Sequence, residues 1–169
     1  MKIKLLNTSQ ANFNKRLNDH LSLKQSAFIG SSMGGMILQN LLSRYPERAS
    51  VGIISNSSSL INTTFQFFIQ AQYEFLTSQS PAEALIKAGL AWGYSYDFLS
   101  QPGMLESMIT LRLNNPHPFT LTGYAGQMDA LRDLDNGTLL PTIPHPCLVI
   151  SADEDIILPH RKSTRLLGQ

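Results

Sequence analysis

The chain has 169 residues, of which 43% are hydrophobic and 15% are charged, and its formal net charge at pH 7 is +1. This composition is typical of one soluble globular domain and gives no electrostatic basis for binding nucleic acid or an anionic membrane. No apolar run approaches the roughly 20 residues that a membrane span needs, and the apolar start is too short for a signal peptide. We therefore expect a cytoplasmic protein.

The number and spacing of the cysteine and histidine residues argue against an internal disulfide and a structural metal site. The single cysteine, Cys147, excludes an internal disulfide, and its apolar surroundings predict a buried, inert thiol. The four histidines show no metal-ligand spacing, so no structural metal is expected.

Helical and strand patterns alternate in the first third of the chain. Residues 11–23 carry apolar side chains at helical spacing, which predicts an amphipathic helix packed on a sheet. The apolar residues 26–30 predict a short buried strand, and residues 34–45 predict a helix that Pro46 ends. Residues 50–55 fit a buried parallel strand. The alternation indicates βαβ units and therefore an α/β fold.

The pattern then changes to successive helical runs without a convincing strand. Four helices are predicted, the first rich in phenylalanine, the second opened by Pro81, the third by Pro102, and the fourth over residues 120–134. Side chains that are candidates to line a substrate cavity, with ordinary core packing as the alternative for each, are Trp92, Phe98, Met108 and Tyr124. A strand is expected again at residues 146–151 and a helix at residues 160–167.

The motif G-x-S-x-G at residues 30–34 lies between the first strand and the following helix. This context is typical of a nucleophile elbow, a sharp turn that holds Ser32 in strained backbone geometry. Gly30 and Gly34 are expected to remove Cβ atoms that would collide at the turn. The backbone N–H of Met33 would then be one donor to an oxyanion. The alternative is a Ser/Gly-rich loop with no chemistry.

Residues 28–35, F-I-G-S-S-M-G-G, and residues 45–48, Y-P-E-R, resemble the α/β-hydrolase fold superfamily. Many members read G-H-S-M-G-G followed by Y-P-E-R-V, so Ser31 replaces the usual His and Ala49 the usual Val. The resemblance implies an α/β fold: a partial α/β-hydrolase parallel sheet with flanking helices and an inserted helical cap. Residues 1–56 and 144–169 would be parts of the hydrolase core, and residues 57–143 the cap.

The same resemblance implies a serine hydrolase that acts on a small-molecule carboxylic ester, lactone or thioester and needs no cofactor. In such an enzyme Ser32 attacks, a His takes its proton, an acid orients that His, and the Met33 amide stabilises the oxyanion. Trp92 would contact the substrate. The helical segment looks most like that of 3-oxoadipate enol-lactonases and pimeloyl-carrier methyl esterases.

The acid is expected in the loop after the last strand. The family usually reads P-x-L-V-I-x-G-x-x-D-x-x-x-P there, which puts Asp155 at the acid position and Ala152 at the usual Gly. The spacing to Pro159 favours Asp155, while Asp153 and Glu154 are the competing carboxylates. The alternative for all three is a solvated acidic loop.

Two parts of the family pattern are not found in the sequence. These are a His in a later loop and an H-G-x-G-type turn before the elbow, which would supply the second oxyanion donor. None of the available histidines replaces the base well, and His160 lies too close in sequence to Asp155 to arrive on a separate loop. We therefore expect a fragment, a truncated gene product or a shortened piece of a hydrolase that is inactive alone.

The sequence is also compatible with a second, non-catalytic function. The chain would then be a non-catalytic remnant that binds a small ligand under the cap or a partner that completes its sheet. Because the earlier strands of the family are not present, one edge of the sheet is expected to keep unpaired N–H and C=O groups. Apolar surface would also stay exposed, so we expect self-association through the sheet edge or marginal folding.

Overall fold

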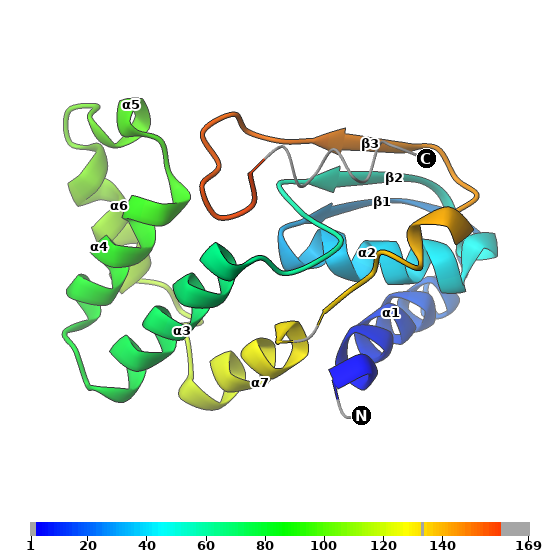
Figure 1. Cartoon of the computed structure of the whole chain (residues 1–169), viewed down its shortest axis with the longest axis horizontal. Coiled ribbons are helices and arrows are strands. Elements are labelled where there is room, and N and C mark those ends of the chain that lie inside the picture. The colour runs from blue at the N-terminus through cyan, green and yellow to red at the C-terminus, as the bar shows by residue number, and fades with distance from the viewer. Residues whose placement is uncertain (1–2, 133, 160–169) are drawn as a thin grey trace. The chain divides into compact units, whose positions relative to one another are not determined.

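A computed structural model describes residues 3–132 and 134–159 of the chain (Figure 1). Its elements in chain order are α1 (Ile3–His20), β1 (Ser26–Ser31), α2 (Met33–Arg44), the 3-10 helix η1 (Pro46–Arg48), β2 (Ala49–Ser55), α3 (Thr63–Thr77), α4 (Ala82–Gly93), α5 (Tyr96–Leu99), α6 (Met104–Leu113), α7 (Leu121–Leu131), the 3-10 helix η2 (Leu140–Thr142) and β3 (Cys147–Ile150). The chain divides into two compact units. We call Met1–Asn62 with Asp129–Gln169 the sheet unit, and Thr63–Met128 the helical unit.

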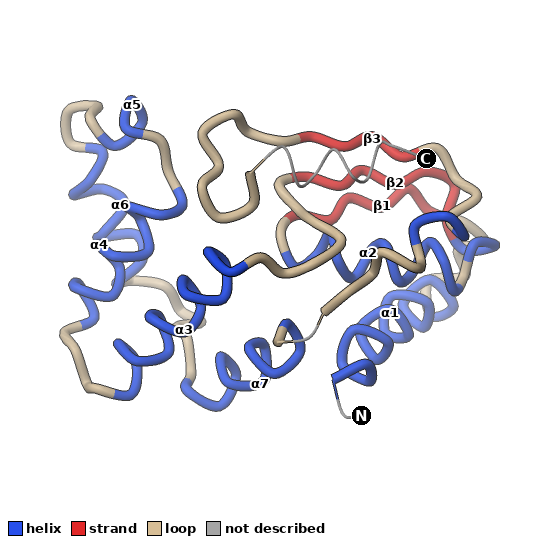
Figure 2. Tube along the Cα trace, in the orientation of Figure 1, coloured by secondary structure: helices blue, strands red, loops and turns tan. Residues whose placement is uncertain are grey.

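The sheet unit contains three parallel strands in the order β1-β2-β3, which lie side by side in Figure 2. The predicted strands at residues 26–30, 50–55 and 146–151 agree with the observed bounds to within one residue at each end. The predicted α/β class with a partial parallel sheet is therefore confirmed. The predicted helix over residues 160–167 lies outside the described residues.

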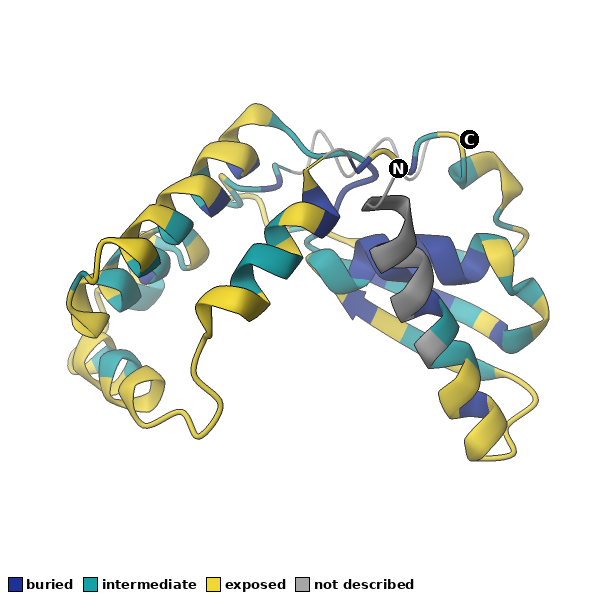
Figure 3. Cartoon of the chain, turned by 90° about the horizontal axis from the view of Figure 1, so that it is seen from below, coloured by how far each residue is buried: buried dark blue, intermediate teal, exposed yellow. Residues whose placement is uncertain are grey.

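The core of the sheet unit lies between α2 and one face of the sheet. Leu38, Leu41 and Leu42 are buried there against Ile54 of β2. A Cβ atom on Gly52 of β2 would lie 2.7 Å from Cδ1 of Leu42, so the glycine lets the helix approach the strand. Burial of each leucine contributes about 1.5–3 kcal/mol. Figure 3 shows the buried residues gathered in α2 and the adjoining strands.

The opposite face of the sheet is apolar and exposed. Ile29 and Leu148 stand in register across β2 and are 75% and 55% exposed, and Ile150 is 47% exposed. The prediction that residues 26–30 form a wholly buried strand is therefore wrong for this face. Apolar side chains on both faces of the strand suit a sheet that is buried on both sides. Helix α2 packs on only one of these faces.

Helix α1 begins at Ile3 and ends at His20, earlier at both ends than the predicted helix over residues 11–23. Its end follows from backbone geometry, because Ser22 has a φ of 55° and the Leu23 amide turns back to the Asn18 carbonyl at 2.9 Å. Within the described residues no helix is both long enough and apolar enough to cross a membrane.

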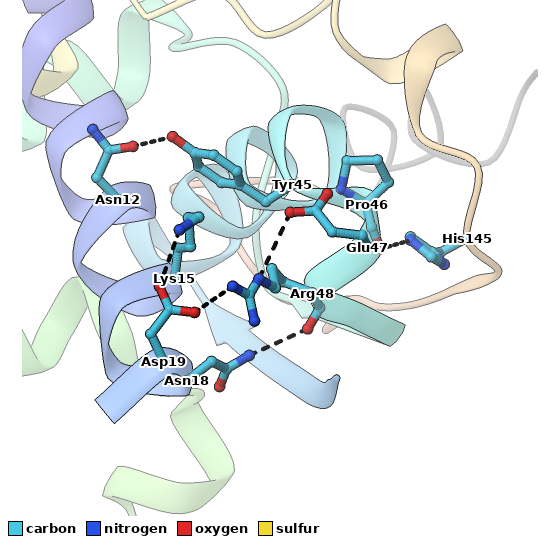
Figure 4. Close-up of polar contacts among 9 residues, drawn as sticks. All are labelled: Asn12, Lys15, Asn18, Asp19, Tyr45, Pro46, Glu47, Arg48 and His145. Atoms are coloured by element: carbon cyan, nitrogen blue, oxygen red, sulfur yellow. Dashed lines mark hydrogen bonds and ion pairs between the residues drawn. The ribbon is translucent and has the colours of Figure 1, made fainter. Parts of the chain in front are cut away.

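Polar contacts tie α1 to the segment before β2 (Figure 4). Asp19 forms ion pairs with Arg48 and with Lys15, the latter at 3.0 Å, and the Asn18 side chain donates to the Arg48 carbonyl at 3.2 Å. The hydrogen bond from Lys15, with the charge of Arg48, holds the pKa of Asp19 below its usual value. Because the pKa of Asp19 is lower in the folded state than in the unfolded state, these contacts stabilise the fold at neutral pH. That stabilisation is lost as the pH falls through the lowered pKa.

The helical unit has a thin core. The predicted helices are present as α3, α4, α6 and α7, and the short α5 is an addition that the sequence reading missed. Ser95 caps α5 by accepting a hydrogen bond from the Phe98 amide at 3.3 Å, a local signal that was available in the sequence. Buried side chains in this unit include Phe65, Ile69 and Leu90, while most of its other residues are partly or fully exposed to solvent (Figure 3).

Candidate active site

Ser32 lies at the sharp turn between β1 and α2. Its backbone has φ 51° and ψ −122°, a strained conformation for a residue other than glycine. The turn is fixed on both sides, because the Ser32 amide donates to the Ser55 carbonyl and the Gly35 amide donates to the Ser32 carbonyl, each at 3.0 Å. The Ser32 side chain is exposed at the end of the strand. A strand, a strained serine and a helix follow one another as in a nucleophile elbow.

The glycines around Ser32 differ in what they allow. A Cβ atom on Gly30 would lie 2.4 Å from the Gly34 carbonyl oxygen, and one on Gly35 would lie 2.6 Å from the Cβ of Ser57. A Cβ atom on Gly34 would meet nothing within 4 Å. The prediction of a collision at Gly34 is therefore wrong, because this position faces open space. Gly30 and Gly35 are the two positions that permit close approach.

Met33 is the first residue of α2. The first amides of a helix have no acceptor in a preceding turn, and they carry the positive end of the helix dipole. An amide in this place is chemically suited to stabilise an oxyanion on a carbonyl attacked by Ser32.

Asp155 lies in the loop after β3, and its own loop holds its side chain. Its Oδ1 accepts hydrogen bonds from the amides of Ile157 at 3.0 Å and Leu158 at 2.7 Å. The Asp155 side chain is partly buried, whereas Asp153 and Glu154 are exposed. Of the three carboxylates, Asp155 therefore has the most defined orientation, and within the described part of the chain its Oδ2 accepts no hydrogen bond.

The topology brings Ser32, Met33 and Asp155 to one edge of the sheet. Ser31, Ser55 and Ile150 are partners in register at the ends of the three parallel strands. Ser32 follows the first of these ends directly, and the loop that carries Asp155 follows the third. The carboxyl edge of a parallel sheet is where open α/β folds build their sites.

The candidate cavity residues belong to the helical unit. Trp92 lies in α4 and packs against Phe68 of α3, with ring centroids 5.5 Å apart. Tyr124 donates its hydroxyl to the Ile69 carbonyl at 3.3 Å, and burial raises the pKa of this phenol to about 12. Both aromatic side chains thus have packing partners within their own unit, and the role of Trp92 in substrate contact stays a prediction.

The described histidines of the sheet unit lie toward the end of the sheet where the strands begin, opposite the carboxyl ends that carry Ser32 and Asp155. His145, two residues before β3, donates from Nε2 to the Pro46 carbonyl at 2.7 Å just ahead of β2 (Figure 4). His20 ends α1, ahead of β1. His117 belongs to the helical unit and is exposed, and His160 lies outside the described residues. Among the described residues of the sheet unit, no imidazole therefore follows the carboxyl end of a strand.

Cys147 lies in β3 and is half-buried, rather than fully buried as expected. Burial raises the pKa of its thiol, which therefore stays protonated at neutral pH. The described part of the chain holds no group of three or more His, Cys, Asp and Glu side chains that suits a metal ion.

The sequence reading missed the polar connection between β2 and α3. Ser57, Ser58 and Ser59 are buried, and the Ser57 hydroxyl donates to the Ser32 carbonyl at 2.8 Å. A run of small polar residues directly after a buried parallel strand was the available signal, since such a run falls at the carboxyl edge of the sheet.

Comparison with known proteins identifies the family. The model of the alpha/beta hydrolase fold matches residues 7–169. The 3-oxoadipate enol-lactonase 2 of Acinetobacter baylyi (strain ATCC 33305 / BD413 / ADP1) is 29% identical over 142 residues, which are 82% of this chain and 50% of the relative. The chain thus spans about half the length of this curated relative.

Solved structures of the same fold superpose on nearly the whole chain. The enol-lactonase from Burkholderia xenovorans LB400 aligns with a TM-score of 0.79 and 22% identity, over 95% of this chain and 59% of its own. A hydrolase from Pseudomonas aeruginosa PA01 aligns with a TM-score of 0.79 and 20% identity, over 95% of this chain and 58% of its own. These likenesses show the fold, and the family match over residues 7–169 shows that the chain belongs to the α/β-hydrolase fold family.

Proposed function

We propose that the sheet unit carries the nucleophile and the acid of a serine hydrolase, with Ser32 as nucleophile and Asp155 as the acid that orients a His. One observation carries this proposal. An exposed serine with φ 51° follows β1 directly, and at the same sheet edge a carboxylate is held by two amides. Backbone strain of this kind costs about 1–3 kcal/mol and clusters at active sites.

In the proposed reaction Ser32 Oγ attacks the carbonyl carbon of an ester, lactone or thioester while a His takes the hydroxyl proton. The carbonyl oxygen becomes an oxyanion, which the Met33 amide stabilises. The His then protonates the leaving alcohol or thiol, and water hydrolyses the acyl-enzyme by the same route. Asp155 accepts a hydrogen bond from the His throughout and keeps the imidazole oriented.

The described residues of the sheet unit supply no His at this edge, so we propose that the chain alone is a poor catalyst. Loss of a triad member typically costs several orders of magnitude in rate. We expect turnover of p-nitrophenyl butyrate to match that of Ser32→Ala. Robust turnover that disappears in Ser32→Ala would contradict this expectation and would point to His160, His117 or a His from a partner.

Relatives named as enol-lactonases support the proposed substrate class. We propose a small ester or lactone as the substrate, with Trp92 among its contacts. The division into core residues 1–56 and 144–169 and cap residues 57–143 belongs to this proposal, as does a cytoplasmic location.

The proposed nucleophile can be tested with an added base. We expect a fluorophosphonate, which captures nucleophilic serines, to label Ser32 slowly, and we expect added imidazole to accelerate the labelling about tenfold or more as a mobile general base. Mass spectrometry of proteolytic peptides locates the label. Ser32→Ala should remove it, and the matched control Ser31→Ala, at the exposed neighbouring position, should keep it. Equal labelling of Ser31, or no labelling of Ser32 with imidazole present, would reject Ser32 as nucleophile.

A second candidate function is non-catalytic binding of a ligand or a partner. It is supported by the lack of an imidazole at the Ser32 edge in the described sheet unit. Labelling of Ser32 that imidazole does not accelerate would favour this second function.

We also propose that the chain self-associates through the edge of β1 and the exposed face beside it. The β1 sequence has no proline and no charged residue, the features that protect edge strands. Sedimentation velocity should show association that rises with concentration and that Ile29→Lys reduces. Leu111→Lys, at an exposed apolar position of the helical unit, is the matched control and should leave association unchanged. A single monomeric species at all concentrations would contradict the proposal.

A further inference from the structure

The connection between β2 and α3, residues 56–62, contacts both segments of the candidate site. At its start Asn56 Oδ1 accepts from the Ala152 amide at 3.1 Å, and Ser57 Oγ donates to the Ser32 carbonyl at 2.8 Å. At its end the Asn62 side chain donates to the Ile157 carbonyl at 3.0 Å. One short segment therefore holds the elbow at one point and the acid loop at two.

The connection is itself fixed in place. Asn56 has a φ of 42°, and its amide donates to the Ile150 carbonyl at 2.8 Å, so its start is tied to the end of β3. Ser57, Ser58 and Ser59 are buried, and the buried Gln39 of α2 donates to the Ser58 carbonyl at 3.1 Å. A segment whose polar groups are buried and paired in this way has little freedom to shift.

The acid loop, in contrast, has no regular structure between the end of β3 and Pro159. Among the described residues, the hydrogen bonds that join this loop to the rest of the chain are those to Asn56 and Asn62, and Asp155 Oδ1 bonds only within the loop. The placement of Asp155 relative to Ser32 therefore depends in part on the connection, together with the burial of Leu158. This dependence matters chemically, because a displacement of about 1 Å at a catalytic constellation can cost about a hundredfold in rate.

We propose that residues 56–62 form a positioning clamp that fixes the acid loop and the nucleophile elbow relative to each other. Asn56, Ser57 and Asn62 are its positioning residues, and none of them takes part in the reaction itself. The role assigned to the clamp rests on the proposed function of Ser32 and Asp155, whereas its contacts can be tested separately.

The acid arm is tested at Asn56 with two substitutions that both tolerate a positive φ. Asn56→Gly removes the acceptor, and Asn56→Asp keeps an oxygen at that place. Amide hydrogen exchange, followed by NMR, is measured at Ala152, Ile157 and Leu158. In Asn56→Gly we expect exchange at all three amides to accelerate about tenfold, the effect of losing roughly 1.4 kcal/mol of protection. Asn56→Asp should restore slow exchange.

A second variant keeps this arm testable if Asn56→Gly does not fold. Asn62→Ala removes the donor to the Ile157 carbonyl, and we expect exchange at Ile157 and Leu158 to accelerate. Amides within β2 are the internal reference and should stay protected. Equal exchange at Ile157 and Leu158 in wild type, Asn56→Gly and Asn62→Ala would overturn the acid arm.

The elbow arm is tested with Ser57→Ala, which removes the hydroxyl that donates to the Ser32 carbonyl. We expect imidazole-assisted fluorophosphonate labelling of Ser32 to slow about tenfold, and exchange of the Gly35 amide, bonded to the same carbonyl, to accelerate. Asn56→Gly should leave the labelling unchanged, because Asp155 acts on a His and not on free imidazole. Wild-type labelling and exchange rates in Ser57→Ala would overturn this arm.

The two levels of the proposal fail in different ways. If wild-type Ser32 is not labelled while the exchange results are as expected, the clamp stands and the proposed function fails. If Ser32 is labelled and the clamp variants change neither labelling nor exchange, the proposed function stands and the clamp fails.

Discussion

Gly30→Ala is expected to destabilise the sheet unit by about 3 kcal/mol or more. The added Cβ would lie 2.4 Å from the Gly34 carbonyl oxygen and 2.8 Å from the Gly35 nitrogen. These are backbone atoms at the start of α2, so no side chain can rotate away and the helix itself must move. Overpacking in a tight core typically costs about 1–3 kcal/mol, and a clash with fixed backbone falls at the upper end or above it. Domains are stable by only about 5–15 kcal/mol, so the loss is large.

Gly34→Ala is the matched control, four residues away in the same motif. Its Cβ would meet nothing within 4 Å, and alanine is favoured over glycine in a helix by up to about 1 kcal/mol. Urea unfolding followed by far-ultraviolet circular dichroism gives the free energy of unfolding of each variant. Fluorescence of the single tryptophan, Trp92, reports the helical unit instead. Equal stability of Gly30→Ala and Gly34→Ala would contradict the close approach at the elbow.

The two glycines also show what could and could not be predicted from the sequence. The position of the turn was predictable, because an apolar run, G-x-S-x-G and a helical pattern follow one another. Which glycine is crowded depends on the packing of α2 against β1 and on the β2–α3 connection. That packing places Gly35, outside the five-residue motif, against Ser57, and it leaves Gly34 in open space.

Strand positions were predictable for a similar reason, and strand exposure was not. The apolar runs set the strand bounds, since each strand of a parallel sheet is suited to burial on both faces. Ile29 is apolar like its neighbours, yet its exposure depends on whether another element packs on that face. Asp155 was selected by its spacing from the strand and from Pro159. Its two amide hydrogen bonds, which distinguish it from Asp153 and Glu154, depend on the loop conformation.

The largest feature missed from the sequence is a buried polar cluster beside the clamp. Asp135, Asn136 and Gly137 are residue types typical of an exposed turn, and Asn136 is nevertheless only 5% exposed. Its side chain donates to the Met36 carbonyl at 2.9 Å and to Gln39 Oε1 at 3.1 Å. These two contacts join residues 100 and 97 positions apart, and no local pattern encodes such a pairing.

Asn136→Ala is expected to destabilise the sheet unit by about 3–5 kcal/mol. The substitution removes both donors and also the oxygen that accepts from Asn40 Nδ2 at 2.9 Å. Gln39 and Asn40 are buried, so groups that lose a partner there cannot turn to bulk water. Each buried polar group left unpaired costs about 1–3 kcal/mol. Asp135→Ala, at the exposed neighbouring position, loses one bond to the Gly137 amide and should cost about 1 kcal/mol or less.

A double-mutant cycle separates this cost from simple loss of contacts. In Asn40→Ala with Asn136→Ala the hydrogen-bonded pair is removed as a unit, so the amide of Asn40 no longer stays buried without its acceptor. The double variant should therefore lose less stability than the sum of the two single variants, by about 1 kcal/mol or more. Urea unfolding of the four proteins under one condition gives this coupling directly. Strict additivity would show that the two side chains act independently, which would contradict the coupling proposed for this pair.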